Sequence, residues 1–292
     1  TTIFTIMSRL AAEHNAINLS QGFPDFDADP SLILAVSEAM AKGQNQYAPM
    51  PGLPDLNVAI ARKLHGDYGW MPDPETEITV TAGGTQALYS IIGAMISQGD
   101  EVIVLEPSYD SYIPSVVSFG GVVKTVQLLP PSYKVNWDEV ESLITSRTKL
   151  IMINTPHNPC GVVLEQSDLH RLEEIVLKHG IYLISDEVYE HIIFDGHQHQ
   201  SVLRFPELYK RSFVVFSFGK SLHVTGWKTG YVIAPPELTT ELRKIHQFNV
   251  FSVNRPIQHG VAYYITHHAD FAALSSFYQD KRDLFLKLMS GL

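Results

Sequence analysis

Short apolar runs alternate with amphipathic stretches along most of this chain. Seven runs have the length of buried strands, and we predict strands at 78–81, 101–105, 122–128, 150–153, 181–185, 213–218 and 230–234. Between them, apolar residues recur at the spacing of one helix face, for example over 168–179. This alternation is typical of an α/β protein, in which helices cover both faces of a mostly parallel, seven-stranded sheet.

The helical pattern predicts where the chain is helical and where ligands bind. Helices are predicted near 85–98, 137–145, 168–179, 237–248, 256–267 and 271–289, and the last of these is expected to leave the α/β domain. In sheets of this class, ligands bind where strands end and helices begin. Polar residues that directly follow a predicted strand are therefore the first candidates for a functional site.

One candidate anion site is Gly83-Gly84-Thr85, after the strand at 78–81. Two glycines permit close approach of the backbone, Thr85 can cap the helix that begins there, and free amides at a helix N-terminus bind phosphate. The alternative is an ordinary turn, because glycines are common between strands and helices. The segment is not a GxGxxG fingerprint, which argues against a dinucleotide site.

A lysine follows the strand at 213–218, in SFGKSLHVTGWKTGY. Lys220 can form a Schiff base with an aldehyde, while Ser217 and Lys228 nearby can hold a phosphate. Pyridoxal phosphate carries both groups. For Lys220 alone, the simpler interpretation is a surface lysine beside a strand.

Asp186 follows the apolar run 181–184. A carboxylate at such a position needs a cationic partner, and a protonated pyridine nitrogen would serve. The alternatives are a helix N-cap or a structural salt bridge. Asp186-Glu187 also resembles a Walker B pair, but no GxxxxGK[ST] segment precedes it, so we set a nucleotidase aside.

Two further polar residues follow predicted strands. Asn158 lies in NTPHNPCG, a loop made rigid by two prolines, and could present its amide to a ring hydroxyl or a carboxylate. Tyr109, in EPSYDSY, could stack on a flat ring. The alternatives are a turn residue for Asn158 and an ordinary core position for Tyr109.

Composition excludes several classes of function. The net charge of −10 argues against general affinity for nucleic acid. A single cysteine, Cys160, permits no internal disulfide and suits a reducing compartment. The N-terminus lacks the order of a signal peptide, and no apolar run is long enough to span a bilayer, so we expect a cytoplasmic protein without a membrane contact. The thirteen histidines form no HExxH pattern, and we expect no metal site.

In this order along the chain, INLSQGFPDF, QYAPMPGLPDL, TPHNPCG, SDEVYEH and SFGKSLHVTGWKTGY resemble class I/II aminotransferases, the pyridoxal-phosphate enzymes of fold type I. The segments look most like bacterial methionine aminotransferase and the kynurenine and glutamine transaminases. The resemblance implies a homodimer with shared active sites. It also implies an N-terminal arm at 1–28, a large cofactor-binding domain at 29–268, and the start of an interdomain helix and small domain at 269–292.

The resemblance also implies roles for individual residues. Lys220 would hold the cofactor and later move a proton, and Asp186 would pair with the pyridine nitrogen. The other implied cofactor contacts are Asn158 and Tyr189 at the ring 3-oxygen, Tyr109 stacked on the ring, Gly84, Thr85, Ser217 and Lys228 at the phosphate, and Tyr47 at the phosphate of the neighbouring subunit. Gly22 and Asn158 would contact the substrate. Lys228 stands where many relatives carry arginine, so the charge is kept but bidentate geometry is lost.

The implied activity is transfer of an amino group from methionine, an aromatic amino acid or glutamine to a 2-oxo acid. Phe23, Tyr47 and Tyr109 would line an apolar pocket. Relatives bind the substrate α-carboxylate with an arginine of the small domain; no arginine here matches that motif, and we expect it to lie outside these 292 residues. The alternatives are a β-lyase of cysteine conjugates on the same fold and a non-catalytic sensor domain.

Overall fold

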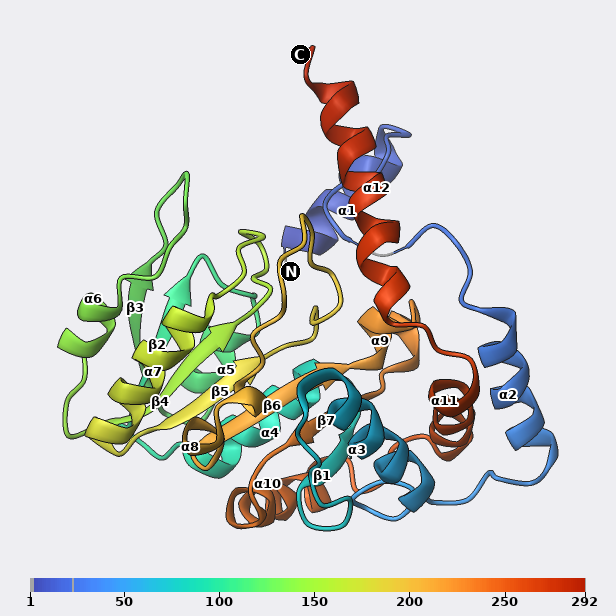
Figure 1. Ribbon diagram of the computed structural model, residues 1–292, viewed down its shortest axis with the longest axis horizontal. Helices are drawn as coiled ribbons and strands as arrows, with labels where there is room; N and C mark the ends of the chain where they lie inside the picture. Colours follow the sequence, from blue (N-terminus) through green and yellow to red (C-terminus); the bar gives the residue numbers. More distant parts are fainter. Residues whose placement is uncertain (1–2, 23, 292) are drawn as a thin grey trace.

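A seven-stranded sheet forms the centre of the computed structural model, which describes residues 3–22 and 24–291 (Figure 1). The strands are β1 (Ile78–Thr81), β2 (Glu101–Glu106), β3 (Val122–Gln127), β4 (Thr148–Asn154), β5 (Tyr182–Asp186), β6 (Ser212–Ser217) and β7 (Gly230–Ile233). Their order is β1-β7-β6-β5-β4-β2-β3, and β7 runs antiparallel to both of its neighbours. The predicted α/β fold is confirmed, and each predicted strand is found within two residues of its expected ends.

Helices account for most of the remaining chain. They are α1 (Ile3–Glu13), α2 (Pro30–Ala41), α3 (Pro54–Tyr68), α4 (Gly84–Met95), α5 (Tyr112–Ser118), α6 (Trp137–Ser142), α7 (Gln166–His179), α8 (Pro206–Tyr209), α9 (Phe218–Ser221), α10 (Pro236–Asn249), α11 (Arg255–His267) and α12 (Ala272–Met289). The sequence pattern predicted α4, α6, α7, α10, α11 and α12. It missed α2 and α3, although each starts with a proline at its first position, which is a recognisable start signal.

The helices cover both faces of the sheet because successive strand residues point to opposite sides. In β2, Val102 and Val104 face one core, whereas Ile103 and Leu105 face the other. The first core is completed by α4, α5 and α10, and the second by α3, α7 and α11. The predicted apolar face of α7 is confirmed as buried; it consists of Leu169, Leu172, Ile175 and Val176.

The sheet brings several strand ends to one edge. Asn154 at the end of β4 pairs with Asp186 at the end of β5, and Ser217 at the end of β6 pairs with Gly230. Thr81, the last residue of β1, pairs with the same Gly230 from the other side. Residues far apart in the sequence therefore meet where a ligand is expected to bind.

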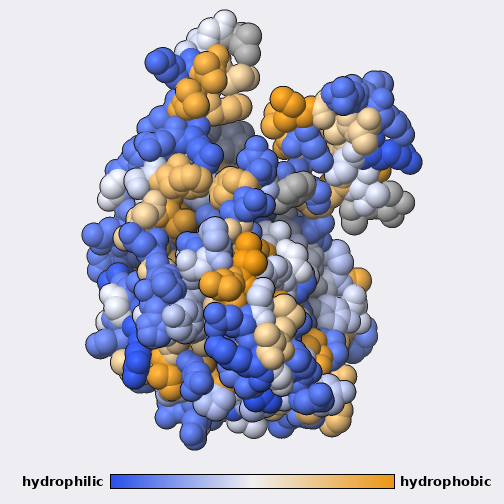
Figure 2. Space-filling model, turned by 90° about the vertical axis from the view of Figure 1, so that its right-hand side faces the viewer, coloured by the Kyte–Doolittle hydropathy of each residue, from blue (hydrophilic) through white to orange (hydrophobic). Residues whose placement is uncertain are grey.

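Two helical segments, α1 and α12, project from the same side of the body (Figure 1). Both carry apolar residues on their surfaces, and Figure 2 shows these as orange areas on the two projections. The exposed apolar residues include Ile3, Met7 and Leu10 of α1 and Leu284, Phe285, Leu286, Leu288 and Met289 of α12. Among the described helices, none has the length and apolar character needed to cross a bilayer.

Candidate active site

Nine of the ten predicted cofactor-binding residues line one cavity at the edge where the strands end. The cavity encloses about 660 Å³, part of it open to solvent. These residues are Gly84, Thr85, Tyr109, Asn158, Asp186, Tyr189, Ser217, Lys220 and Lys228. They come from the ends of β5 and β6, the start of α4, the short helix α9 and four loops or turns, so the tertiary fold alone assembles them.

One end of the cavity is built to receive an anion. Helix α4 begins at Gly84, so its first free amides point to this end. The residue before it, Gly83, has φ 82° and ψ 170°, a conformation available essentially to glycine. A Cβ on Gly83 would lie 3.3 Å from Lys228 Nζ and crowd the same space. The prediction that Thr85 caps α4 is wrong, because the N-cap is Gly83 and Thr85 lies inside the first turn.

The ammonium group of Lys228 and the hydroxyls of Thr85 and Ser217 complete this end. Lys228 has φ 50° and ψ 57°, the left-handed region that is costly for a residue with a Cβ. Thr85 Oγ1 lies 3.4 Å from the Tyr109 hydroxyl. Ser217 ends β6, beside Gly230, whose Cβ would lie 2.6 Å from the Phe216 carbonyl oxygen. The glycine therefore allows β7 to approach both β6 and the start of α4.

Lys220 lies in α9, directly after β6. Its Nζ is 5.2 Å from the centroid of the Tyr189 ring, and both side chains line the cavity. Within the described part of the chain, neither Lys220 nor Lys228 has a carboxylate within salt-bridge distance. Lys220 is half-buried and lines the cavity, so it is not the exposed surface lysine of the simpler interpretation. With no carboxylate partner among the described residues, its amine is available to a ligand.

Asp186, the last residue of β5, also lines the cavity and is only 4% exposed. The Tyr112 hydroxyl donates a 2.6 Å hydrogen bond to Asp186 Oδ2, and the Val188 amide donates to Oδ1 over 3.3 Å. Burial raises the pKa of Asp186 to about 6, while the bond from Tyr112 and the charge of Lys220 oppose that rise. A buried carboxylate held in this way attracts a cationic ligand group.

Asn158 and Tyr189 line the same cavity and contact each other. The Asn158 backbone amide donates to Asn154 Oδ1 over 2.6 Å, and Asn154 Nδ2 donates to the Asp186 carbonyl oxygen over 2.8 Å. Burial raises the pKa of the Tyr189 hydroxyl, and a hydrogen bond with the Asn158 side chain lowers it. Asn154 thus fixes the Asn158 loop to the end of β5.

Sequence reasoning missed Tyr112 and Asn154. Both support the cavity through Asp186, and Tyr112 is almost fully buried. Their only signals were that Tyr112 stands three residues after Tyr109 and that Asn154 directly follows the predicted strand at 150–153. Neither signal indicates which residue is bound, and the partner of Tyr112, Asp186, is 74 residues away in the sequence.

The predicted substrate contacts are divided between different places. Gly22 lines a second cavity together with Lys220 and Tyr189, so the structure brings it beside the first cavity. Tyr47 is 77% exposed and lies outside both cavities. Phe23 lies outside the described residues. The described residues that line these two cavities include no arginine.

The Aminotransferase class I and II family model matches residues 14–291. The chain belongs to this family. Methionine aminotransferase of Escherichia coli is 48% identical over 99% of this chain and 75% of its own length. The kynurenine–oxoglutarate transaminase of Dictyostelium discoideum is 34% identical over 99% of this chain and 71% of its own length.

Solved structures agree with this assignment. A crystal structure of the Escherichia coli methionine aminotransferase superimposes with a TM-score of 0.97 and covers 99% of this chain and 77% of the other. N-Succinyldiaminopimelate aminotransferase of Mycobacterium tuberculosis gives 0.96 at 37% identity, over 100% of this chain and 77% of the other. The predicted family and fold are confirmed, and the chain is an amino-acid aminotransferase.

The residues of the cavity fit pyridoxal phosphate, the cofactor this family uses. The ammonium group of Lys228, the hydroxyls of Thr85 and Ser217 and a helix N-terminus suit its dianionic phosphate. The buried carboxylate of Asp186 suits a protonated ring nitrogen, and the amine of Lys220 suits an aldehyde. Three chemically different groups of one ligand thus find their counterparts in one aminotransferase cavity.

Replacing Asp186 by Asn is expected to stabilise the cofactor-free aminotransferase above pH 6. The folded protein holds the Asp186 proton up to about pH 6, whereas the unfolded chain releases it near 3.8. The carboxyl group therefore favours the folded state below pH 4, and this advantage is lost as pH rises to 6. At pH 8 we expect Asp186→Asn to raise the free energy of unfolding by about 1–3 kcal/mol.

Urea unfolding of both cofactor-free proteins at pH 4 and pH 8 measures this effect. The increase in the free energy of unfolding caused by Asp186→Asn should be present at pH 8 and small at pH 4. An equal gain at both pH values would show that the ionised carboxylate is not the source of the cost. Asp138→Asn, which changes an exposed carboxylate, serves as the control and should leave stability unchanged within about 0.5 kcal/mol.

Proposed function

We propose that this chain transfers the amino group of an apolar amino acid, methionine first, to a 2-oxo acid, with pyridoxal phosphate held in the cavity at the strand ends. The observation that carries the proposal is the convergence of Lys220, Asp186 and the anion-binding end of the cavity. The preference for methionine is supported by the 48% identity to an enzyme of that name. Phe26, Ile192 and Tyr278 line the second cavity with Lys220 and support an apolar substrate side chain; Asp25 and Lys281 also line it, with opposite charges.

Each group of the cofactor has a proposed partner. Lys220 would hold it through a covalent C–N bond, and Asp186 would keep the ring nitrogen protonated. Tyr109 would stack on the ring, and Asn158 with Tyr189 would bind its 3-oxygen. The phosphate would be held by Gly84, Thr85, Ser217 and Lys228. When bound, pyridoxal phosphate supplies an aldehyde for the amino group and a ring that withdraws electrons from the substrate Cα.

Lys220 has the second, catalytic task in this proposal. Once the substrate amine takes its place, the free Nζ removes the proton from the substrate Cα. A positioned proton acceptor of this kind typically contributes about 10²–10⁴-fold to the rate. Tyr189, whose ring lies 5.2 Å from Lys220 Nζ, keeps the amine over the reacting atoms. Gly22 and Asn158 would contact the substrate from opposite walls.

Several sequence-based predictions concern the assembled protein. We propose a homodimer in which Tyr47 reaches the phosphate site of the partner subunit; its high exposure and its position outside the cavity support this. The exposed apolar surface of α1 is also suited to contact with another chain. The arm at 1–28, the large domain at 29–268, the start of a small domain at 269–292 and the cytoplasmic location stay predictions.

A panel of amino donors tests the proposed substrate. Purified protein loaded with pyridoxal phosphate is mixed with methionine, phenylalanine, glutamine or aspartate and several 2-oxo acids, and the amino acid formed is measured. We expect methionine or phenylalanine to exceed aspartate at least about 10-fold in kcat/KM, because an apolar wall cannot solvate a second carboxylate. Aspartate as the preferred donor would contradict the proposal. Pyruvate and ammonia released from a cysteine conjugate without any acceptor would instead indicate a β-lyase.

A further inference from the structure

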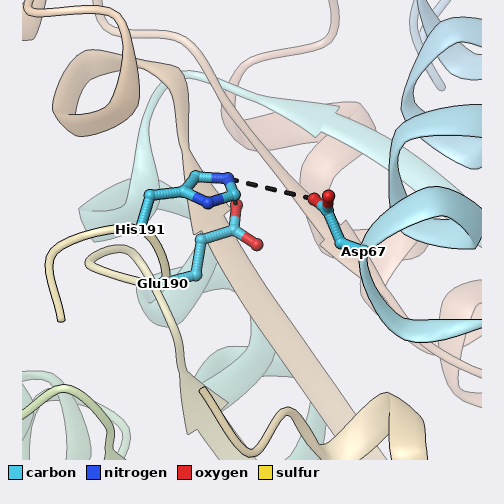
Figure 3. A group of neighbouring side chains, drawn as sticks. All are labelled: Asp67, Glu190 and His191. Atoms are coloured by element: carbon cyan, nitrogen blue, oxygen red, sulfur yellow. Dashed lines mark ion pairs between the residues drawn. The ribbon is translucent and has the colours of Figure 1, made fainter. Parts of the chain in front are cut away.

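A buried cluster of charged residues lies directly beyond Tyr189 in the chain. Glu190 and His191 follow Tyr189, and Lys63 and Asp67 reach them from α3. Figure 3 shows Asp67 on its helix facing His191 and Glu190 across a short gap. None of these four residues lines the cofactor cavity. The cluster is therefore a structure of its own that the catalytic site does not explain.

Lys63 and Glu190 form the centre of this cluster. Lys63 Nζ lies 2.9 Å from Glu190 Oε1 and 2.9 Å from Asp67 Oδ2, and the Lys63 and Glu190 side chains are 6% and 5% exposed. The Tyr68 hydroxyl donates to the other carboxylate oxygen of Glu190. Both oxygens of the buried carboxylate are thus bound, and both partners are residues of α3.

The cation of this cluster is the lysine. Asp67, Glu190 and His191 each place a ligand atom within 4.8 Å of the others, as the ligands of a metal ion would. Lys63 Nζ already lies between the two carboxylates and supplies the positive charge. Although burial alone would lower the pKa of Lys63, the charges of Glu190 and Asp67 raise it above its usual range. Burial likewise opposes ionisation of Glu190, but the charges of Lys63 and His191 hold its pKa well below the usual range.

The backbone around Tyr189 depends on such an anchor. After Asp186 the chain leaves β5 and turns, and the turn is closed by backbone bonds from Glu190 to Glu187 and from Ile192 to Tyr189. The start of the turn is fixed by Glu187, whose amide donates to Val215 of β6 and whose carboxylate contacts His199 and Val202. At Glu190, directly after Tyr189, the Lys63–Glu190 pair ties the turn to α3.

We propose that the Lys63–Glu190 ion pair is a positioning device for Tyr189. It holds the turn after β5 against α3 and so keeps the Tyr189 hydroxyl beside Asn158 and its ring beside Lys220. This inference rests on the proposed function, because the hydroxyl matters as a donor to the 3-oxygen of pyridoxal phosphate. The simpler alternative is an ion pair that only stabilises the fold.

The double variant K63M/E190Q separates these two roles. Replacing Lys63 or Glu190 alone changes the charge of the buried pair, whereas replacing both removes the two charges together. The Asp67 carboxylate, which also contacts Lys63, is 31% exposed and keeps His191 Nε2 at 4.0 Å. The side-chain amide that E190Q introduces can still accept the bond from Tyr68. Three quantities are measured. The first is the midpoint at which the visible absorbance of the bound cofactor changes with pH, the second is the Kd of the cofactor, and the third is the Tm of the cofactor-free protein.

We expect the midpoint of K63M/E190Q to rise by about 0.4–1 pH unit and the Kd for the cofactor to increase by up to about 10-fold. Both are measured at a temperature well below the Tm of the variant. A hydrogen bond to the deprotonated form favours that form, so its weakening raises the midpoint. The control is K42M/E38Q, which removes an exposed i,i+4 pair at the C-terminal end of α2 and should change neither the midpoint nor the Kd. A lowered Tm with unchanged midpoint and Kd would overturn the inference.

The route through Tyr189 is tested by adding Tyr189→Phe. In that background K63M/E190Q should give no further rise of the midpoint, because the hydroxyl it positions is gone. A full, additive rise would overturn the inference. If K63M/E190Q does not fold, E190Q alone removes the ion pair while Lys63 keeps Asp67 as its partner, and an unchanged midpoint in that variant counts equally against the inference. Wild-type protein without a cofactor band would overturn the proposed function as well, whereas a normal wild-type band with unresponsive variants overturns this inference alone.

Discussion

Lys220→Ala is expected to abolish amino transfer, with kcat at least about 10⁴-fold below that of the wild type. The substitution removes both the amine that holds the cofactor and the group that moves the Cα proton. It leaves the anion-binding end intact, since Gly84, Ser217 and Lys228 are unchanged. The variant should therefore still bind pyridoxal phosphate, but without a covalent bond.

Borohydride reduction followed by peptide mapping measures the covalent part directly. In the wild type the cofactor should be fixed to one peptide, the one that contains Lys220, and in Lys220→Ala to none. Lys210→Ala is a suitable control, because Lys210 is exposed and pairs with Glu207 at the surface. A label on a peptide without Lys220 would show that the central assignment is wrong.

Asp186→Ala is expected to retain weakened cofactor binding and to lose nearly all turnover, by about 10³-fold or more in kcat. Without the buried carboxylate the ring nitrogen loses the charge that keeps it protonated, and the ring withdraws electrons poorly. The anion end, which Asp186 does not touch, still holds the phosphate. Single-turnover absorbance changes with methionine measure the loss, since they report proton removal without the second substrate.

Tyr112→Phe refines the interpretation of Asp186. This variant keeps the carboxylate but removes its 2.6 Å hydrogen bond, so a loss between those of the wild type and Asp186→Ala is expected. Asp138→Asn, an exposed carboxylate, should leave turnover unchanged. Unchanged turnover in Asp186→Ala would remove the electron-withdrawal argument.

The sheet was predictable because each strand carries its own signal. A run such as 213–218 is apolar on both faces, as a strand buried between two layers of helices must be, and the structure places β6 there. Helix α7 was predictable for the same reason, since its buried face follows the helical period. The helices α1 to α3 were missed because they precede the first predicted strand, where no alternation of strands and helices marks them, although α2 and α3 each begin with a proline.

The candidate site was predicted from the rule that ligands bind at strand ends, and from family resemblance. Lys220 and Asp186 were found because a charged residue directly after an apolar strand is unusual. Thr85 lines the cavity as predicted but does not cap α4. The sequence does not show whether α4 starts at Gly84 or later. Tyr112 has no such signal, since an aromatic residue in a helix is most often ordinary core.

By itself the sequence determined the seven strands, six of the helices and, through its motifs, the family. The strands and helices follow from local properties, namely periodicity and turn residues. The family follows from the resemblance of ordered segments. Only the tertiary structure decided that Tyr112 holds Asp186, that Asn154 ties the Asn158 loop to β5, and that Lys63 is paired with Glu190. The bonds from Asn154 to Asp186 and from Lys63 to Glu190 join residues 32 and 127 positions apart, and a contact over that distance depends on how the whole sheet and its helices pack.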